Sequence, residues 1–146
     1  MRRDYLVYPS MIEAQTGVIW SYDNPNVVST FDSANPLNVS SSQCHDLSIC
    51  LWYVSPLHPL NNASGTTYAL LGEWNKWTAV SQQRIASIVT DIEKNQATIT
   101  VQGVSGEIVP VVVFHSVLLS VTVNCPISSI NGQALLVITP LNIVCS

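Results

Sequence analysis

The strict alternation of apolar and polar residues at positions 97–102 constrains the fold of this chain more than any other stretch. Alanine, isoleucine and valine alternate there with threonine and glutamine, which is typical of a strand with one buried and one solvated face. Segments 17–22 and 27–31 are rich in β-branched and aromatic residues, and the turn-forming residues 23–26 separate them as in a β-hairpin. About eight to ten short strands follow one another without a convincing amphipathic helix. The sequence therefore predicts an all-β fold, an antiparallel β-sandwich.

Two connections carry further expectations about the fold. Residues 32–46 are rich in Ser, Asn and Pro and lack a hydrophobic period, which favours a long surface loop. Asn131 and Gly132 separate two β-branched segments, 116–124 and 134–139. Because both central residues of a type I′ turn need a positive φ, the Asn-Gly pair indicates a hairpin at that point.

The length of the chain and its scarcity of charge bear on domain organisation and partners. At 146 residues the chain has the length of one domain. We expect a single β-sandwich domain over residues 1–146, with residues 1–46 as an extended or swapped N-terminal segment in an alternative arrangement. Only 10% of the residues are charged, against roughly 25% in an average soluble domain. Much of the surface is then uncharged, and we expect glycans, another protein domain or a second copy in a homo-oligomer to cover part of it.

Charge and hydropathy also exclude classes of partner. The net charge is −4, and five Lys and Arg residues leave no basic stripe that could neutralise several phosphates, so we expect no binding of nucleic acid. Pro110, His115 and several hydroxyl residues interrupt the longest apolar run. Because a membrane-spanning helix needs ~18 consecutive apolar residues, we expect no membrane span.

The four cysteines lie in two close pairs, Cys44 with Cys50 and Cys125 with Cys145. Four cysteines allow three connectivities, of which we favour the two local pairings. A histidine and an aspartate follow Cys44, but the spacing matches no structural zinc pattern. We therefore expect disulfides and no metal site.

Two N-glycosylation sequons begin at Asn38 and Asn62 in polar sequence that is typical of loops. An attached glycan would add a bulky, solubilising group to the surface. Sequons together with paired cysteines favour an oxidising compartment, so we expect a secreted, extracellular glycoprotein.

Residues 72–77 form a corner that mixes large aromatic side chains with opposite charges. Glu73 and Lys76 beside Trp74 and Trp77 are candidates for sugar contact, because aromatic faces stack on carbohydrate while a carboxylate accepts hydroxyl hydrogen bonds. Tryptophan is more often a core residue in a β-rich domain, and a Glu and Lys three residues apart form an ordinary solvated pair. The same four residues are therefore also candidates for docking a protein surface.

The sequence offers no arrangement of residues for catalysis. Glycoside hydrolysis needs two carboxyl groups across the scissile bond, and the nine acidic residues are scattered along the chain. The chain has neither a Gly-x-Ser-x-Gly elbow nor a phosphate-binding glycine loop. We expect a protein without enzymatic activity and without a cofactor.

Four segments, residues 51–56, 68–77, 80–84 and 101–107, resemble the C-terminal region of alpha-galactosidase-like (melibiase) glycoside hydrolases. The shared pattern contains leucine-leucine-glycine-glutamate, then lysine and tryptophan, then valine-serine and arginine, and later valine, glycine and glutamate. The resemblance covers residues 47–146 and implies an accessory β-sandwich that packs on a catalytic barrel. A (β/α)₈ barrel takes roughly 250 residues, more than this chain holds, so no catalytic residue carries over.

Two hypotheses about function follow. The first is a secreted, non-catalytic β-sandwich module, similar to a glycosidase C-terminal domain, with a structural or carbohydrate-associated role. The second is a self-assembling extracellular structural subunit, in which strand edges or swapped segments join copies into an oligomer or filament. If the corner at residues 72–77 docks a protein surface, Trp74→Ala or Trp77→Ala should impair folding or assembly more than ligand affinity.

Overall fold

The described part of the chain is built from strands. The computed structural model describes residues 5–22, 24–39, 51–60, 65–74 and 76–146. These residues hold 13 strands and one short 3-10 helix, and the strands form four antiparallel sheets, so the predicted all-β class is confirmed. The chain divides into two compact units, Met1–Leu57 (the N-terminal unit) and His58–Ser146 (the C-terminal unit). The single domain expected over residues 1–146 stays a prediction.

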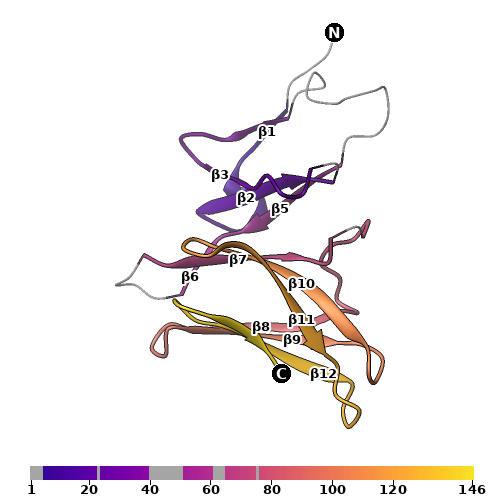
Figure 1. The fold of residues 1–146 in the computed structure, drawn as a ribbon. Coiled ribbons are helices and arrows are strands. Elements are labelled where there is room, and N and C mark those ends of the chain that lie inside the picture. The colour runs from indigo at the N-terminus through magenta and orange to yellow at the C-terminus, as the bar shows by residue number, and fades with distance from the viewer. Residues whose placement is uncertain (1–4, 23, 40–50, 61–64, 75) are drawn as a thin grey trace. The chain divides into compact units, whose positions relative to one another are not determined.

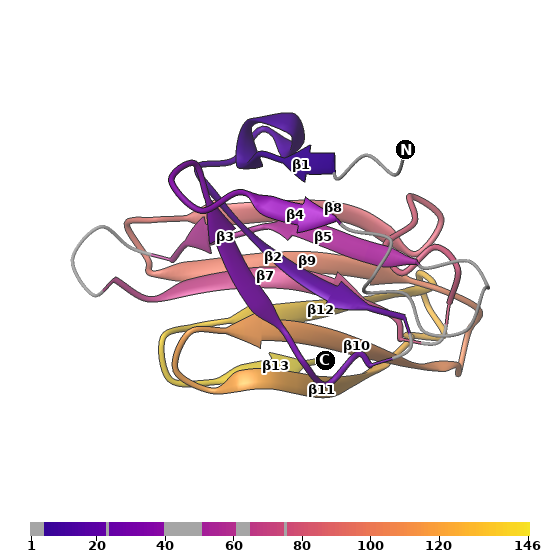
Figure 2. The ribbon, with the colours of Figure 1, turned by 90° about the horizontal axis from the view of Figure 1, so that it is seen from above.

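The N-terminal unit contains two small sheets. Its elements are β1 (Tyr5–Val7), the 3-10 helix η1 (Pro9–Ile12), β2 (Thr16–Ser21), β3 (Ser29–Asp32), β4 (Leu37–Val39) and β5 (Trp52–Pro56). Strand β2 pairs with β3 and β5, while β1 pairs with β4 (Figure 2). The β2–β3 hairpin confirms the prediction for residues 17–31. The surface loop predicted for residues 32–46 is wrong over β4, because residues 37–39 complete an antiparallel ladder with β1.

Aromatic side chains fix the packing of β2. The ring of Trp20 stacks on Tyr53 of the neighbouring strand β5, with ring centroids 5.4 Å apart. Gly17 lies opposite Phe31, and a Cβ atom at position 17 would approach the phenyl ring to 2.5 Å. Glycine fits this position because the ring occupies the space that a side chain would need.

The C-terminal unit is an antiparallel β-sandwich, as the sequence predicts. Two four-stranded sheets face each other (Figure 1), one in the order β11-β10-β7-β6 and the other in the order β13-β12-β9-β8. Hydrophobic side chains from both sheets form one cluster between them. The eight strands are β6 (His58–Pro59), β7 (Thr67–Gly72), β8 (Ile85–Asp91), β9 (Gln96–Gln102), β10 (Ile108–His115), β11 (Leu119–Pro126), β12 (Gln133–Ile138) and β13 (Ile143–Cys145).

The core of the sandwich follows the alternation seen in the sequence. Ala97, Ile99 and Val101 of β9 are fully buried, and the residues between them are only partly buried. They belong to the same cluster as Val111 and Val113 of β10, on the facing sheet. Fully burying an aliphatic side chain of this size contributes about 1.5–3 kcal/mol, so the inward residues of the two sheets supply the main stabilisation of the unit.

His115 is a fully buried polar residue at the end of β10. Its Nδ1 accepts hydrogen bonds from the backbone N–H groups of Val117 and Leu118, both at 3.2 Å. Its Nε2 lies 3.1 Å from the carbonyl oxygen of Thr139. These partners require the neutral ring with its proton on Nε2, and they make the imidazole a structural brace for the turn that joins β10 to β11.

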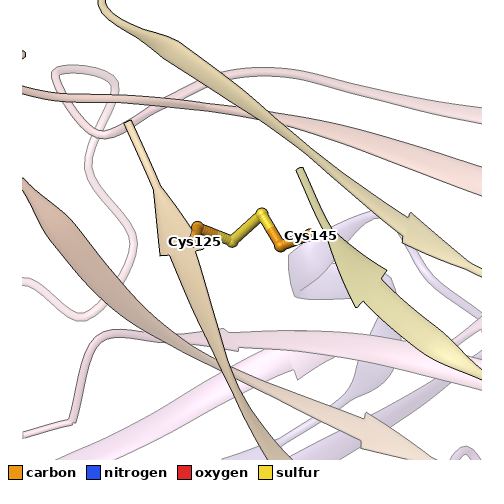
Figure 3. The surroundings of a disulfide bond; sticks show 2 residues. All are labelled: Cys125 and Cys145. Atoms are coloured by element: carbon orange, nitrogen blue, oxygen red, sulfur yellow. A yellow bond between two sulfur atoms is a disulfide. The ribbon is translucent and has the colours of Figure 1, made fainter. Parts of the chain in front are cut away.

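A disulfide joins the two sheets of the sandwich. Cys125 of β11 is bonded to Cys145 of β13 (Figure 3), and their Cα atoms lie 5.1 Å apart. The first of these strands belongs to one sheet and the second to the other. The structure thus contains the predicted pair, whereas Cys44 and Cys50 lie outside the described residues.

The hairpin predicted at Asn131 and Gly132 is wrong. Strands β11 and β12, which flank it, lie in different sheets. Gly132 has a φ of 68°, but Asn131 has no positive φ, so the two residues do not form a type I′ turn. The N–H of Gly132 donates to the carbonyl of Ser128, and the N–H of Gly103 donates to the carbonyl of Gly132, both at 3.0 Å. The turn therefore anchors a crossing from one sheet to the other.

Candidate functional site

The corner after β7 is closed on itself. The N–H of Glu73 donates to the carbonyl of Ala79 over 2.8 Å. Gly72, just before it, has a φ of 83°, in the left-handed region that glycine adopts without strain. A Cβ atom at Gly72 would also collide with the carbonyl group of Ala79. Glycine at position 72 therefore allows the chain to bend and return to within one hydrogen bond of itself.

Arg84 binds two carboxylates beside this corner. Its Nε donates to Oε2 of Glu73 over 3.1 Å, while Nη1 and Nη2 donate to Oε2 and Oε1 of Glu107 at 3.0 and 2.8 Å. The contact with Glu107 is bidentate, which suits the planar fork of a guanidinium. Only 20% of the Arg84 side chain is exposed. The cluster thus joins three segments that are distant in sequence.

Backbone groups hold this ion cluster in place. Nη1 of Arg84 also donates to the carbonyl of Gln102 over 3.0 Å, and the N–H of Val104 donates to Oε2 of Glu107 over 2.9 Å. A Cβ atom at Gly103 would lie 2.5 Å from both Nη1 of Arg84 and Oε2 of Glu107. The glycine therefore leaves the space in which the guanidinium meets its second carboxylate.

The ion pairs shift the titration of both partners toward their charged forms. Hydrogen bonding to Glu107 raises the pKa of Arg84 above its ordinary value, although desolvation opposes the shift. The hydrogen bonds from Arg84, followed by the backbone N–H of Val104, lower the pKa of Glu107. The charge of Lys76 acts on Glu107 in the same direction. Glu107 is therefore held as a carboxylate.

The cluster forms part of an open hollow of about 590 Å³. Trp77 lies at this hollow and is 72% exposed. The hollow is lined by Glu73, Lys76, Trp77, Thr78, Ser81, Gln83, Arg84, Gly103, Val104 and Glu107. Its lining combines an exposed aromatic face, hydroxyl and amide groups, and an ion cluster.

Of the four corner residues predicted as a site, the structure brings three to the hollow. Glu73, Lys76 and Trp77 line it, whereas Trp74 does not. The Nε1 atom of Trp74 is buried, and no described residue accepts a hydrogen bond from it. The two tryptophans therefore differ in environment, although sugar contact and protein docking were predicted for both of them.

Sequence reasoning missed Arg84 and Glu107 as site residues. The nine acidic residues are scattered along the sequence, but two of them, Glu73 and Glu107, meet on one guanidinium in the structure. All three ion-cluster residues lie in the four segments on which the expected relation to melibiase C-terminal domains rests. No spacing or periodic pattern in the sequence brings these three residues together.

The predicted glycosylation sites are placed only in part. Asn38 lies in β4 and is exposed, so it is in a strand and not in the expected loop, while Asn62 lies outside the described residues. Within the described ranges, no group of three or more His, Cys, Asp or Glu residues is arranged to hold a metal ion. No helix in the same part of the chain is long and apolar enough to cross a membrane.

Comparisons with protein-family models, with curated proteins and with solved structures found no match to this chain. The fold and the hollow define a class of protein: an all-β protein that contains a disulfide and has a surface hollow lined by ion pairs and an exposed tryptophan.

The environment of Glu107 is unfavourable for a general acid. A general acid needs a pKa near the working pH. In a carboxyl group, burial or a neighbouring carboxylate normally raises the pKa to that range. The hydrogen bonds from Arg84 instead lower the pKa of Glu107. Paired carboxylates still have lone pairs free to accept hydroxyl hydrogen bonds, and an exposed indole offers an apolar face beside them.

Glu107 determines an expected response to acid. Its pKa is lowered in the folded protein, so its contribution to stability is present above the ordinary pKa of a glutamate and is lost as the pH falls through the lowered value. We expect the midpoint of urea unfolding to fall between about pH 5 and pH 3. Glu107→Gln should reduce that dependence. Glu93→Gln, at an exposed glutamate in the β8–β9 turn, is the matched control, and equal pH profiles for the two variants would contradict the expectation.

Proposed function

We propose that this protein is a secreted, non-catalytic β-sandwich module that binds carbohydrate in the hollow beside Arg84. The observation that carries the proposal is the exposed indole of Trp77 at a polar hollow whose carboxylates are already ion-paired. Aromatic faces bind the C–H surface of a sugar ring, while fixed polar groups select its hydroxyls. The hollow offers both within one surface.

The charge of the hollow supports a neutral ligand. The carboxylates of Glu73 and Glu107 are balanced by the guanidinium of Arg84 and the ammonium of Lys76, which all line the same space. Such a cluster presents donors and acceptors without a strong net charge. A neutral polyol can exchange hydrogen bonds with it at a smaller desolvation cost than a charged ligand would meet.

The absence of catalysis is supported by the ionised state of Glu107. A retaining or inverting glycosidase needs one carboxyl group protonated as the acid, whereas Arg84 keeps the pKa of Glu107 low. The resemblance to a melibiase accessory domain is in line with this role, because such a domain carries no catalytic residue.

Secretion is supported by the disulfide and by a sequon. The Cys125–Cys145 bond joins the two sheets, and disulfides persist in oxidising compartments. Asn38 is exposed on β4, so an oligosaccharide could be attached there without disturbing a core. Intact mass before and after deglycosylation and reduction would test both modifications together.

The test of the function is binding of the full chain to a glycan array, followed by calorimetry with the glycans retained. Trp77→Ala should weaken binding about tenfold, because it removes the stacking face. Its melting temperature should change little, since so much of the indole is exposed. Trp77→Phe should recover part of the affinity, and Leu141→Ala, at another strongly exposed apolar residue, should have no effect.

Two results would overturn the proposal. A wild-type chain that retains no glycan, or a Trp77→Ala chain that binds as well as wild type, would remove the role of the hollow in binding. Turnover of an aryl galactoside that Glu73→Gln abolishes would show that the hollow is catalytic.

A further inference from the structure

Strand β11 is the longest edge strand of the sandwich, and one of its sides has no strand partner among the described residues. The ends of the two sheets are β11 and β6 in one and β13 and β8 in the other. Strand β11 has eight residues, β8 seven, β13 three and β6 two. An unpaired edge exposes a row of backbone N–H and C=O groups that can pair with another strand.

The other three edges carry features that discourage such pairing. Strand β6 is short and ends in Pro59, and β13 is short and joined to β11 by the disulfide. Strand β8 has a shifted register between Ile85 and Ser87, and it ends at Asp91, which pairs with Lys94. Bulges, charges, proline and short length are the usual protections of an edge.

Strand β11 lacks these protections over most of its length. Its register against β10 is regular from end to end. None of its eight residues is charged, and its one proline, Pro126, is the last of them. A long, regular, uncharged edge is the type that associates with another chain.

The turn before β11 adds an exposed apolar surface to this edge. Val117, Leu118 and Leu119 are 63%, 40% and 65% exposed. Leu119 has a φ of 63°, a left-handed conformation that is strained for a branched side chain. Glycine would relieve that strain, so an exposed leucine in this conformation, directly after the turn that His115 braces, indicates a use for its side chain outside the monomer.

We propose that β11 is a dimerisation edge, at which two copies of this chain pair their β11 strands antiparallel about a two-fold axis. The sheet that contains β11 in one copy then joins the same sheet of the second copy, and together they form one continuous eight-stranded sheet. The proposal goes beyond the carbohydrate-binding function and uses none of the residues that line the hollow.

The register of the dimer follows from the faces of the strand. Val121, Val123 and Cys125 pair with core residues of β10, whereas Ser120, Thr122 and Asn124 lie on the other face. Opposite residues of an antiparallel pair share a face. The two-fold axis must therefore place one residue of β11 directly opposite the same residue of the second copy. Placing it at Thr122 pairs Val121 with Val123 of the second copy and leaves Pro126 outside the ladder. Thr122 then lies opposite Thr122 of the second copy.

Charge favours a second copy over a membrane surface as the occupant. The chain has no Lys or Arg after Lys94, so β10, β11 and their turn carry no cation that could bind an anionic membrane, the usual complement to apolar insertion. Self-pairing brings no like charges opposite each other. A two-fold contact also closes after two copies, which matches a discrete oligomer.

The test measures the mass of the full chain in solution by light scattering and sedimentation. Wild type should form a dimer at micromolar concentration. Thr122→Lys should raise the dissociation constant about tenfold or more, because it places two ammonium groups opposite each other. Val89→Lys, on the outer face of the β8 edge, is the matched control and should leave the dimer intact.

A second measurement tests the register through crosslinking. Residues directly opposite in an antiparallel pair have Cα atoms about 4.5–5.5 Å apart, within reach of a disulfide. Thr122→Cys should therefore give a covalent dimer on mild oxidation, whereas Asn124→Cys, opposite Ser120 of the second copy, should not. A wild-type monomer at high micromolar concentration, polymers in place of a dimer, or a dimer that Val89→Lys breaks and Thr122→Lys keeps would overturn the proposal.

Discussion

Replacing Gly72 with alanine is expected to lower the free energy of unfolding of the sandwich by about 3 kcal/mol. About 1 kcal/mol of this comes from the left-handed backbone, which a Cβ atom disfavours, and the rest from crowding against a backbone group that cannot rotate away. That group is the carbonyl of Ala79, which closes the corner by accepting a hydrogen bond from Glu73. Urea denaturation followed by circular dichroism measures the change.

Gly106 provides the matched control for Gly72. Its φ is 80°, close to the 83° of Gly72, but no atom lies within 4 Å of the Cβ position that alanine would add. Gly106→Ala should therefore cost only the backbone part, about 1 kcal/mol. Equal losses at the two positions would contradict the closed corner.

Removing the Cys125–Cys145 bridge should produce the second large effect. The two cysteines are 20 residues apart, and a loop of this size adds about 3 kcal/mol of stability by restricting the unfolded chain. The Cys125→Ala/Cys145→Ala double variant should unfold at a correspondingly lower urea concentration than wild type. Its midpoint should no longer respond to a reductant in the way that the wild-type midpoint does.

Cys44→Ala/Cys50→Ala is the control for that experiment. A bridge between these two cysteines would close a much shorter loop, and shorter loops contribute less. If the two double variants lose the same stability, the loop-closure account of the sheet-to-sheet bond is wrong.

Local pattern was sufficient to predict much of the fold. Alternation at residues 97–102 predicted β9 and its buried face, because the side chains of a strand point to opposite faces in turn. The hairpin predicted at Asn131 and Gly132 was wrong because the residues of a turn favour a local backbone conformation but do not determine which strands pair. The segments on either side belong to different sheets that face one shared core, and that arrangement decided the connection.

The candidate site was predictable only where its residues are close in sequence. Glu73, Lys76 and Trp77 could be grouped because they share one corner. Arg84 and Glu107 are 23 residues apart, and no periodic pattern links a guanidinium to a carboxylate at that distance. Their contact depends on the space that Gly103 leaves, which becomes visible only once the strands on either side are placed.

The bond between Cys125 and Cys145 also determines how the sandwich responds to force. A load applied to the chain beyond Cys145 passes through the two sulfur atoms to β11 and bypasses the 19 residues between the cysteines. Strand β12 and the crossing at Gly132 therefore bear no tension while the bond is intact, and the pull is resisted by the β10–β11 ladder. Reduction would transfer the same load to β13, which has only three residues. The redox state of one disulfide bond thus determines which strand is pulled out first.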